Sequence, residues 1–434
     1  MLKKLVVATA ILTSAVSLQA LSFEDVKDKV KSSIDDINEF RDPSDKSAKE
    51  MVEAKKSKKK KTVKKEELYH AVWKKMYGGE DGDIAHGIVA LDNGDSVMVG
   101  TCRSFGAKRT DICVSRMNNK GAMSWRLLLG GEKEDDGKAI IRTADGNLMV
   151  LGSSKSYAKS YDRDLYVAKI SLEGNVIWDQ SFGGDRDEFA GGIAETDDGG
   201  ALVVGNTTSY GKGYKDIYIA KLNKNGKMIS SFIVGGKKED SAEALTRTKD
   251  GNMVLVGYRE KGRAGNTDFF VLKMDQNGKK IWSQTYGGDL SDRLNGVTAT
   301  ADGGIVATGS TSSYKSENTD MSIMKLNADG KMLWHKIYGF KYYEYGNAVA
   351  ATSDGGVMIA GGTSTLGKGD HSAYLIALDN SGKLVWSHVY GNRGKDSVNA
   401  ITRLSDGSMI AVGGSDSYSR STKIYMLNIA KKEK

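Results

Sequence analysis

Hydrophobic and polar residues alternate in short runs along most of the chain, the pattern of half-buried β-strands. Between residues 292 and 340, for example, such runs cover 296–300, 305–311, 321–326 and 331–338, and turn sequences such as Ala301-Asp302-Gly303-Gly304 separate them. The 3.6-residue period of a helix is missing from this part of the chain. The pattern predicts four antiparallel strands in a unit of about fifty residues, the size of a propeller blade.

This unit recurs through the chain in one register. All six tryptophans mark the same position of the repeat, and Ser230 stands where a seventh would fall. They are Trp73, Trp125, Trp178, Trp282, Trp334 and Trp386. A glycine recurs in the same way at Gly100, Gly152, Gly205, Gly257, Gly309, Gly361 and Gly413, and an Asp-Gly or Asn-Gly turn precedes each of them. We therefore predict an all-β, seven-bladed, WD40-like β-propeller over residues 67–434.

The two ends of the repeat region indicate how the ring closes. The seventh repeat stops after its third strand, 423–429, while residues 68–77 have a fourth-strand sequence and stand before the first repeat. We expect this N-terminal strand to complete the last blade, because that pairing leaves no open sheet edge.

The first 66 residues have a different composition. Lys3 and Lys4 precede an apolar run from 5 to 16, and Ala20 offers a small residue for cleavage, so residues 1–20 are predicted to be a secretory signal peptide. No cysteine follows Ala20 to accept a lipid. Apolar residues at spacings of three and four predict an amphipathic helix over 21–41. The expected location is periplasmic or secreted.

Residues 42–66 form a Lys-rich segment with few apolar residues, which is predicted to be a flexible linker. Its cations are an alternative contact for an anionic membrane surface: Lys55, Lys56, Lys58, Lys59, Lys60, Lys61, Lys64 and Lys65. The net charge of the chain is +8. Part of it lies in this segment, so the repeat region is nearly balanced and a nucleic-acid partner is not expected.

The only two cysteines, Cys102 and Cys113, fall on neighbouring predicted strands. A cross-strand disulfide and two buried free thiols are both compatible with this spacing. The five histidines show no ligand spacing, so neither a metal site nor a cofactor is expected.

Binding residues are expected on the face that carries the longer loops, since loops on a rigid scaffold usually provide recognition. An acid follows each Gly-Gly turn there, just before the innermost strand and near the channel mouth. Seven carboxylates could form a cation-binding funnel, or each could accept backbone N–H bonds in its own turn. They are Asp83, Asp135, Glu188, Asp240, Asp292, Glu344 and Asp396.

One loop departs from the repeat. Residues 338–345 replace the usual Gly-Gly-acid turn with a cluster of aromatics. Exposed aromatics on a rigid rim commonly anchor a partner, although such rings can also fill the space of a missing glycine. The hypothetical binding site comprises Phe340, Lys341, Tyr342, Tyr343 and Tyr345, with Tyr314 and Lys368 contributing.

The repeat also resembles known families. The strings 325–334, KLNADGKMLW, and 170–178, ISLEGNVIW, resemble the turn-and-Trp element of quinoprotein-type propellers. The whole repeat over 68–434 is more similar to secreted bacterial β-propeller repeat proteins. The wider quinoprotein-like superfamily includes both dehydrogenases and periplasmic assembly scaffolds, so the resemblance implies the fold only.

The favoured interpretation is a non-catalytic exported binding or scaffold module that recognises a protein or a glycan. A periplasmic quinoprotein-like oxidoreductase is one alternative. It is disfavoured because no haem-attachment or nucleophile motif is present and because such enzymes typically have eight blades. A passive surface or structural protein is the other alternative. The sequence does not indicate an oligomeric state.

Overall fold

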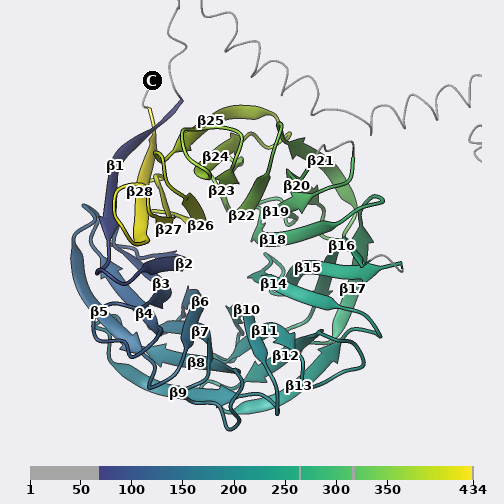
Figure 1. The fold of residues 1–434 in the computed structure, drawn as a ribbon. Coiled ribbons are helices and arrows are strands. Elements are labelled where there is room, and N and C mark those ends of the chain that lie inside the picture. Colours follow the sequence, from purple (N-terminus) through teal and green to yellow (C-terminus); the bar gives the residue numbers. More distant parts are fainter. Residues whose placement is uncertain (1–67, 263–264, 315–317, 433–434) are drawn as a thin grey trace, which may run out of the picture.

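The computed structural model describes residues 68–262, 265–314 and 318–432, and these form seven four-stranded antiparallel sheets around a central axis (Figure 1). The described residues contain strands and turns but no helix. The predicted all-β, seven-bladed propeller is therefore confirmed. The predicted signal peptide (1–20), amphipathic helix (21–41) and Lys-rich linker (42–66) lie outside the described residues. No described segment is a helix that could cross a membrane.

Each blade runs from its innermost to its outermost strand. Blade 1 holds β2 (Asp83–Ala90), β3 (Ser96–Cys102), β4 (Asp111–Met117) and β5 (Met123–Leu129). Blade 2 holds β6 (Asp135–Arg142), β7 (Leu148–Ser154), β8 (Asp164–Ile170) and β9 (Val176–Phe182). Blade 3 holds β10 (Glu188–Glu195), β11 (Ala201–Thr207), β12 (Asp216–Leu222) and β13 (Met228–Val234). Blade 4 holds β14 (Asp240–Arg247), β15 (Met253–Lys261), β16 (Asn266–Met274) and β17 (Lys280–Tyr286).

The remaining blades follow the same order. Blade 5 holds β18 (Asp292–Ala299), β19 (Ile305–Thr311), β20 (Asp320–Leu326) and β21 (Met332–Tyr338). Blade 6 holds β22 (Glu344–Ala351), β23 (Val357–Thr363), β24 (Ser372–Leu378) and β25 (Leu384–Tyr390). Blade 7 holds β26 (Asp396–Arg403), β27 (Met409–Ser415) and β28 (Lys423–Lys431), and β1 (Tyr69–Tyr77) is its outermost strand.

The ring closes as the sequence predicted. β1 pairs antiparallel with β28, and the amide of Lys432 donates to the carbonyl of Leu68 beyond the end of the pairing. Tyr69 is buried and its ring lies 5.5 Å from that of Trp386 in the neighbouring blade. The first and last strands of the propeller therefore hold one sheet together and leave β28 without a free edge.

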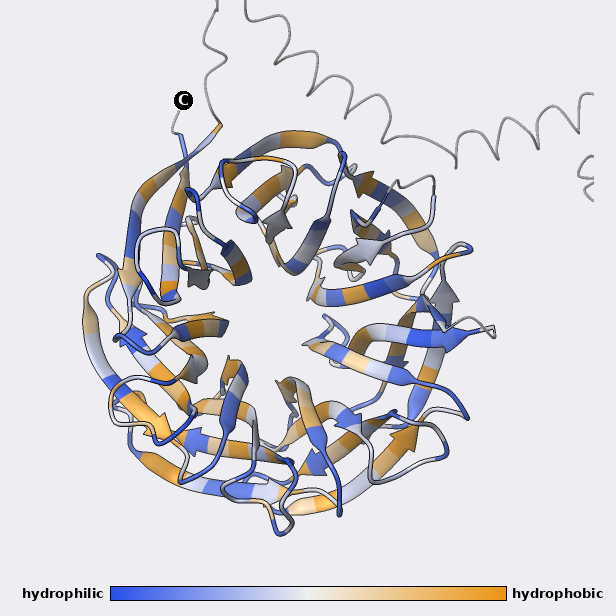
Figure 2. Ribbon diagram, viewed as in Figure 1, coloured by the Kyte–Doolittle hydropathy of each residue, from blue (hydrophilic) through white to orange (hydrophobic). Residues whose placement is uncertain are grey.

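The core lies between adjacent blades. The middle strands of each blade are buried on both sides, while the fourth strands face solvent. Figure 2 shows hydrophobic and hydrophilic residues alternating along the strands. One cluster, for instance, joins Val97 and Ile112 of blade 1 to Leu148 and Tyr166 of blade 2. Each blade thus needs its neighbours to cover its faces.

The repeated tryptophans connect neighbouring blades. The indole N–H of Trp125 in blade 1 donates 2.9 Å to the carbonyl of Leu172 in the turn of blade 2, and its ring packs on Gly174. Trp178, Trp282 and Trp334 make the same contact with the turn of the next blade. The fifty-two-residue tryptophan period therefore records a contact between blades.

Every innermost strand contains a β-bulge. In blade 5 the register shifts between Leu294 and Gly296, and Gly309 of β19 pairs at this point. A Cβ on Gly309 would collide with the backbone carbonyl of Arg293, and the equivalent glycines of the other blades face an equivalent carbonyl. The glycine that recurs in all seven repeats is thus required by the close approach of two backbones at the bulge.

The bulge also explains an error in the predicted strand bounds. The alternation pattern predicted a first strand over 296–300, whereas β18 begins at Asp292. The extra residue, Asn295, shifts the side-chain alternation by one position, so the polar residues before it do not continue the pattern. The last strand, β28, also extends two residues beyond the predicted end at 429.

Candidate binding face

The seven acids are the first residues of the innermost strands, and they are 0–5 % exposed. In every blade the carboxylate accepts the backbone N–H of the residue four positions earlier, as Asp292 does from Gly288 at 2.9 Å and Glu344 from Phe340 at 2.9 Å. The same bond is made by Asp83, Asp135, Glu188, Asp240 and Asp396. The acids close their own turns instead of presenting a charged ring to the channel.

A hydroxyl nineteen residues further along completes most of these turns. Thr207 donates to Glu188 and Thr363 to Glu344, and Ser or Thr does so in blades 2, 5 and 7. Burial raises the pKa of Asp292 despite the bond from Thr311. Two blades depart from this rule, because Cys102 takes the hydroxyl position in blade 1 and Arg259 in blade 4, where Arg259 pairs with Asp240 at 2.6 Å.

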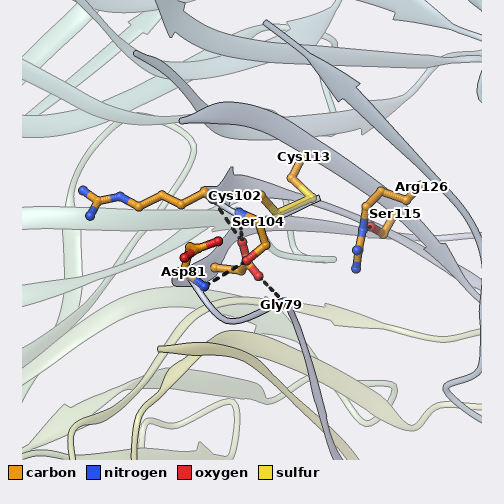
Figure 3. The surroundings of a disulfide bond; sticks show 9 residues. Gly79, Asp81, Cys102, Ser104, Cys113, Ser115 and Arg126 are labelled. Atoms are coloured by element: carbon orange, nitrogen blue, oxygen red, sulfur yellow. Dashed lines mark hydrogen bonds between the residues drawn. A yellow bond between two sulfur atoms is a disulfide. The ribbon is translucent and has the colours of Figure 1, made fainter. Parts of the chain in front are cut away.

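Cys102 of β3 and Cys113 of β4 form a disulfide with a Cα–Cα distance of 5.6 Å (Figure 3). The strand register places them diagonally, since Cys113 lies opposite Gly100. Cys102 is therefore bonded to Cys113 at the position where five other blades have a hydroxyl that donates to the acid. In blade 1 the Asp83 carboxylate accepts backbone N–H groups instead, including those of Arg103 and Ser104.

The aromatic loop between β21 and β22 has an exposed tip on a fixed backbone. Tyr342 and Tyr343 are 46 % and 52 % exposed, and the Lys341 ammonium lies 5.1 Å from the centre of the Tyr342 ring. The amide of Tyr342 donates to Thr365 Oγ1 and that of Tyr343 to Ser364 Oγ, both at 2.9 Å. The two rings are thus presented to solvent by a loop that is hydrogen-bonded to the next long loop.

The other residues of this hypothetical site lie differently. Phe340 is partly buried, and Tyr345 belongs to β22 rather than to the loop, with its ring against Gly362 and 6.4 Å from that of His371. Burial raises the pKa of Tyr345. The inclusion of Tyr345 in an exposed loop cluster was therefore wrong, because its alternation with buried Glu344 and Gly346 makes it part of the strand.

Tyr314 and Lys368 lie in the long loops of blades 5 and 6. Tyr314 is 43 % exposed, has a φ of 56° and packs edge-on against His335 at 5.2 Å. Lys368 is exposed and lies in the loop between β23 and β24, whose Thr365 and Ser364 accept the amides of Tyr342 and Tyr343. In blades 2 and 3 the equivalents of Tyr314 fold back, since the hydroxyls of Tyr157 and Tyr210 donate to Gly130 and Gly183.

Sequence reasoning missed the two most exposed aromatic side chains of the described residues. Tyr161 and Tyr214 are 89 % and 83 % exposed, and they lie in the long loops of blades 2 and 3. The Lys133 ammonium lies 5.0 Å from the Tyr161 ring. Each lies nine residues after its repeat glycine, Gly152 or Gly205, a position that is aromatic in these two repeats alone. An aromatic residue inside a Gly/Lys/Ser loop was therefore a usable signal.

The central channel carries a second set of missed residues. The bulged residue of each innermost strand, three positions after its acid, lines a cavity of about 230 Å³. These residues are His86, Lys138, Gly191, Glu243, Asn295, Asn347 and Asn399. Lys138 lies 4.0 Å from Glu243, and burial together with Lys138 lowers the pKa of His86 to about 4. The repeat register contained this set, but only the bulge reveals that it faces the channel.

Chemically, the channel and the loop face offer binding groups. In the three segments that the structure describes, no group of three or more His, Cys, Asp or Glu side chains is placed to hold a metal ion. The fold and these surfaces define a β-propeller with a polar channel and an aromatic, cationic loop face.

One β-propeller family model matches a short part of the chain. Residues 300–332 match the family model described as "Domain of unknown function (DUF5122) beta-propeller". No curated protein sequence matches the chain.

Three solved structures are similar in shape. The WD40 domain of Pan2 from Neurospora crassa is 10 % identical over 82 % of this chain and 98 % of that one, with a TM-score of 0.48. A protein of unknown function from Dyadobacter fermentans is 12 % identical over 84 % of this chain and 100 % of that one, with a TM-score of 0.48. Sqt1 from Chaetomium thermophilum is 12 % identical over 78 % and 83 %, with a TM-score of 0.45. At these values the likeness carries no argument.

Proposed function

We propose that this β-propeller is a non-catalytic binding or scaffold module that holds a protein or a glycan on its long-loop face. The observation that carries the proposal is the pair Tyr342 and Tyr343, two half-exposed rings on a loop whose amides are bonded to Thr365 and Ser364. Rigid aromatics bind at a low entropic cost, because little freedom remains to be lost. Lys341 adds a cation beside the rings, which suits an acidic or polar partner.

Binding is tested by comparing two double variants of the whole chain. Tyr342→Ala/Tyr343→Ala removes the proposed anchors, and Tyr161→Ala/Tyr214→Ala removes two even more exposed aromatics from blades 2 and 3. The probes are a glycan array and chemical crosslinking to envelope proteins followed by mass spectrometry. We expect the first variant to lose at least about tenfold in affinity, as anchor residues do, and the second to retain binding. Equal affinity of the first variant and the wild type would refute the site.

The chain is further proposed to be exported, with cleavage after Ala20 and a periplasmic or secreted location. The Cys102–Cys113 disulfide supports this proposal, because such bonds persist in oxidising compartments. N-terminal sequencing of the protein from fractionated cells tests it. An N-terminus at Met1 in the cytoplasmic fraction would contradict it.

The resemblance to quinoprotein-like propellers leaves an oxidoreductase as the competing proposal. The polar channel with His86, Lys138 and Glu243 is where a bound group would lie. Absorbance spectra and mass spectrometry of the protein purified from its native source distinguish the two proposals. A stoichiometric quinone or haem in the purified protein would favour the oxidoreductase. A copurified protein or glycan without such a cofactor would favour the binding module.

A further inference from the structure

Two sets of polar residues meet at the interfaces between blades. At five interfaces the acid that begins an innermost strand and the first residue of the third strand in the preceding blade, or its equivalent in blade 4, both lie beside the first glycine of the connecting turn. The third-strand residues are Asp111, Asp164, Asp216, Asp268 and Lys423. Four interfaces therefore bring two carboxylates together. Buried like charges at such positions need a compensating cation or a proton.

At two interfaces a lysine supplies the positive charge. Between blades 7 and 1, Lys423 replaces the partner acid, and its ammonium donates to the carbonyl of Gly79. Between blades 4 and 5, the ammonium of Lys261 donates to Oδ1 of Asp268 and to the carbonyl of Gly288. Gly79 and Gly288 are the second glycines of their turns, so a cation lies at the same place in both interfaces.

Three further interfaces have other solutions. Between blades 3 and 4, Arg259 pairs with Asp240, so one of the two facing acids has a cation even though Oδ1 of Asp216 is also buried without a hydrogen-bond partner. Between blades 6 and 7, Ser372 takes the place of the second acid. Between blades 5 and 6, Asp320 lies beside the turn glycine Gly339 and takes part in other interactions.

The interface between blades 2 and 3 has no such cation on its facing oxygens. Oδ1 of Asp164 is buried without a hydrogen-bond partner, and Asp164 is 3 % exposed. A Cβ on Gly183 would collide with both this oxygen and Oε2 of Glu188, so glycine keeps open a space that two carboxylates share. A pocket of about 280 Å³ adjoins Asp164 and Gly183 from outside. The oxygens of Glu188 accept one bond each, from Thr207 and Gly184, and keep capacity for another partner.

The interface between blades 1 and 2 repeats this arrangement. Oδ1 of Asp111 is buried without a hydrogen-bond partner, and Asp111 is 7 % exposed. A Cβ on Gly130 would meet this oxygen and would lie 2.8 Å from Oδ2 of Asp135.

We propose that Asp164 with Glu188, and Asp111 with Asp135, each bind a calcium ion that joins two blades. The ion would lie where the lysine ammonium lies in the other interfaces, next to the carbonyl of the second glycine, Gly184 or Gly131. Carboxylate and carbonyl oxygens are calcium ligands, and calcium tolerates an irregular shell completed by water. With only two carboxylates per site, backbone and water must supply the rest, which disfavours zinc.

A shared proton is the competing way to relieve the two charges. Burial, with Glu188 contributing, raises the pKa of Asp164 to about 6, although a hydrogen bond from the Lys159 backbone opposes the rise. Calcium would displace that proton at neutral pH. The exposed Lys159 adjoins the same pocket and is the other candidate counter-charge.

The test uses the whole chain after dialysis against a chelator, titrated with calcium chloride alone. We expect binding of two equivalents by calorimetry and a rise in Tm of about 2 °C or more at saturation, with a smaller response to magnesium. Absence of both binding and a Tm rise at millimolar calcium would overturn the proposal in favour of a shared proton.

Three variants locate the ion. Asp164→Lys copies the natural Lys423 arrangement, so it should fold and bind one equivalent less. Glu188→Gln should also bind one equivalent less, and its single amide oxygen can still accept the Gly184 N–H. The matched control Asp268→Asn changes the same position where Lys261 already supplies the charge, and it should keep full stoichiometry. Full stoichiometry in Asp164→Lys, or a loss of calcium binding in Lys159→Ala equal to that in Glu188→Gln, would refute the assignment.

Discussion

Replacement of Gly205 by alanine should destabilise the propeller although Gly205 lies in a regular strand. A Cβ at this position would lie 2.5 Å from the carbonyl oxygen of Phe189 and 3.1 Å from Cδ2 of Leu165. The oxygen belongs to the bulged backbone of β10 and cannot rotate away, so the two strands must separate. Overpacking of this kind costs about 1–3 kcal/mol.

Gly236→Ala is the matched control in the turn that precedes blade 4. No heavy atom lies within 4 Å of its ideal Cβ position, its φ is not positive, and its amide can still donate to Asp240. The added methyl group restricts the unfolded chain, so the expected effect ranges from none to a gain of about 1 kcal/mol.

Urea unfolding followed by tryptophan fluorescence measures both variants, since the six tryptophans lie in six of the seven blades. The expected result is a lower midpoint for Gly205→Ala at an unchanged m-value, and a difference of about 2 kcal/mol from Gly236→Ala. If the two variants differ by less than about 0.5 kcal/mol, the steric explanation of the repeated glycine is wrong.

Three further outcomes are expected. Lys325→Ala should lower the free energy of unfolding in urea by about 1–3 kcal/mol, because the buried ammonium donates to Asp302. Lys331→Ala, at an exposed position, should leave it nearly unchanged, and equal losses in the two variants would contradict a stabilising role of Lys325. The bond from Lys325 lowers the pKa of Asp302 from 3.8 to about 2. The ionised Asp302 therefore contributes fully to the free energy of unfolding above pH 4, and this contribution is lost as the pH falls towards 2. A Lys325→Ala variant whose acid-unfolding curve parallels that of the wild type would refute this. Dithiothreitol, which opens the Cys102–Cys113 bond, should lower stability by about 2–3 kcal/mol, and Cys102→Ser/Cys113→Ser should be insensitive to it; a wild type unaffected by dithiothreitol would indicate free thiols.

The sequence determined the architecture because a propeller repeats one local pattern. The strands, the Asp-Gly turns and the tryptophan position recur about every fifty-two residues. Because the fourth strand of the last repeat is found before the first repeat, seven such units can close into a ring only when the N-terminal strand joins the last blade. The pairing of β1 with β28 could be predicted for the same reason. Local alternation is enough for these features.

The candidate site was predictable only in part. Tyr342 and Tyr343 stood out because they break the repeat, and the structure exposes them. The burial of the seven acids and the strand position of Tyr345 depended on where each loop ends, which a two-residue period does not specify. Tyr161 and Tyr214 share a repeat position that is not aromatic in the other blades, so no sevenfold pattern marked them.

The tertiary structure alone decided the contacts between blades and the lining of the channel. Asp164 and Glu188 are 24 positions apart in different blades, and no local pattern indicates that their carboxylates face each other across Gly183. Likewise, the bulge turns His86 and Lys138 into the channel by shifting one residue out of register. The two-residue period of a strand indicates which face of the sheet a side chain lies on. The residues that this side chain contacts in the next blade depend instead on how the sheets pack around the axis.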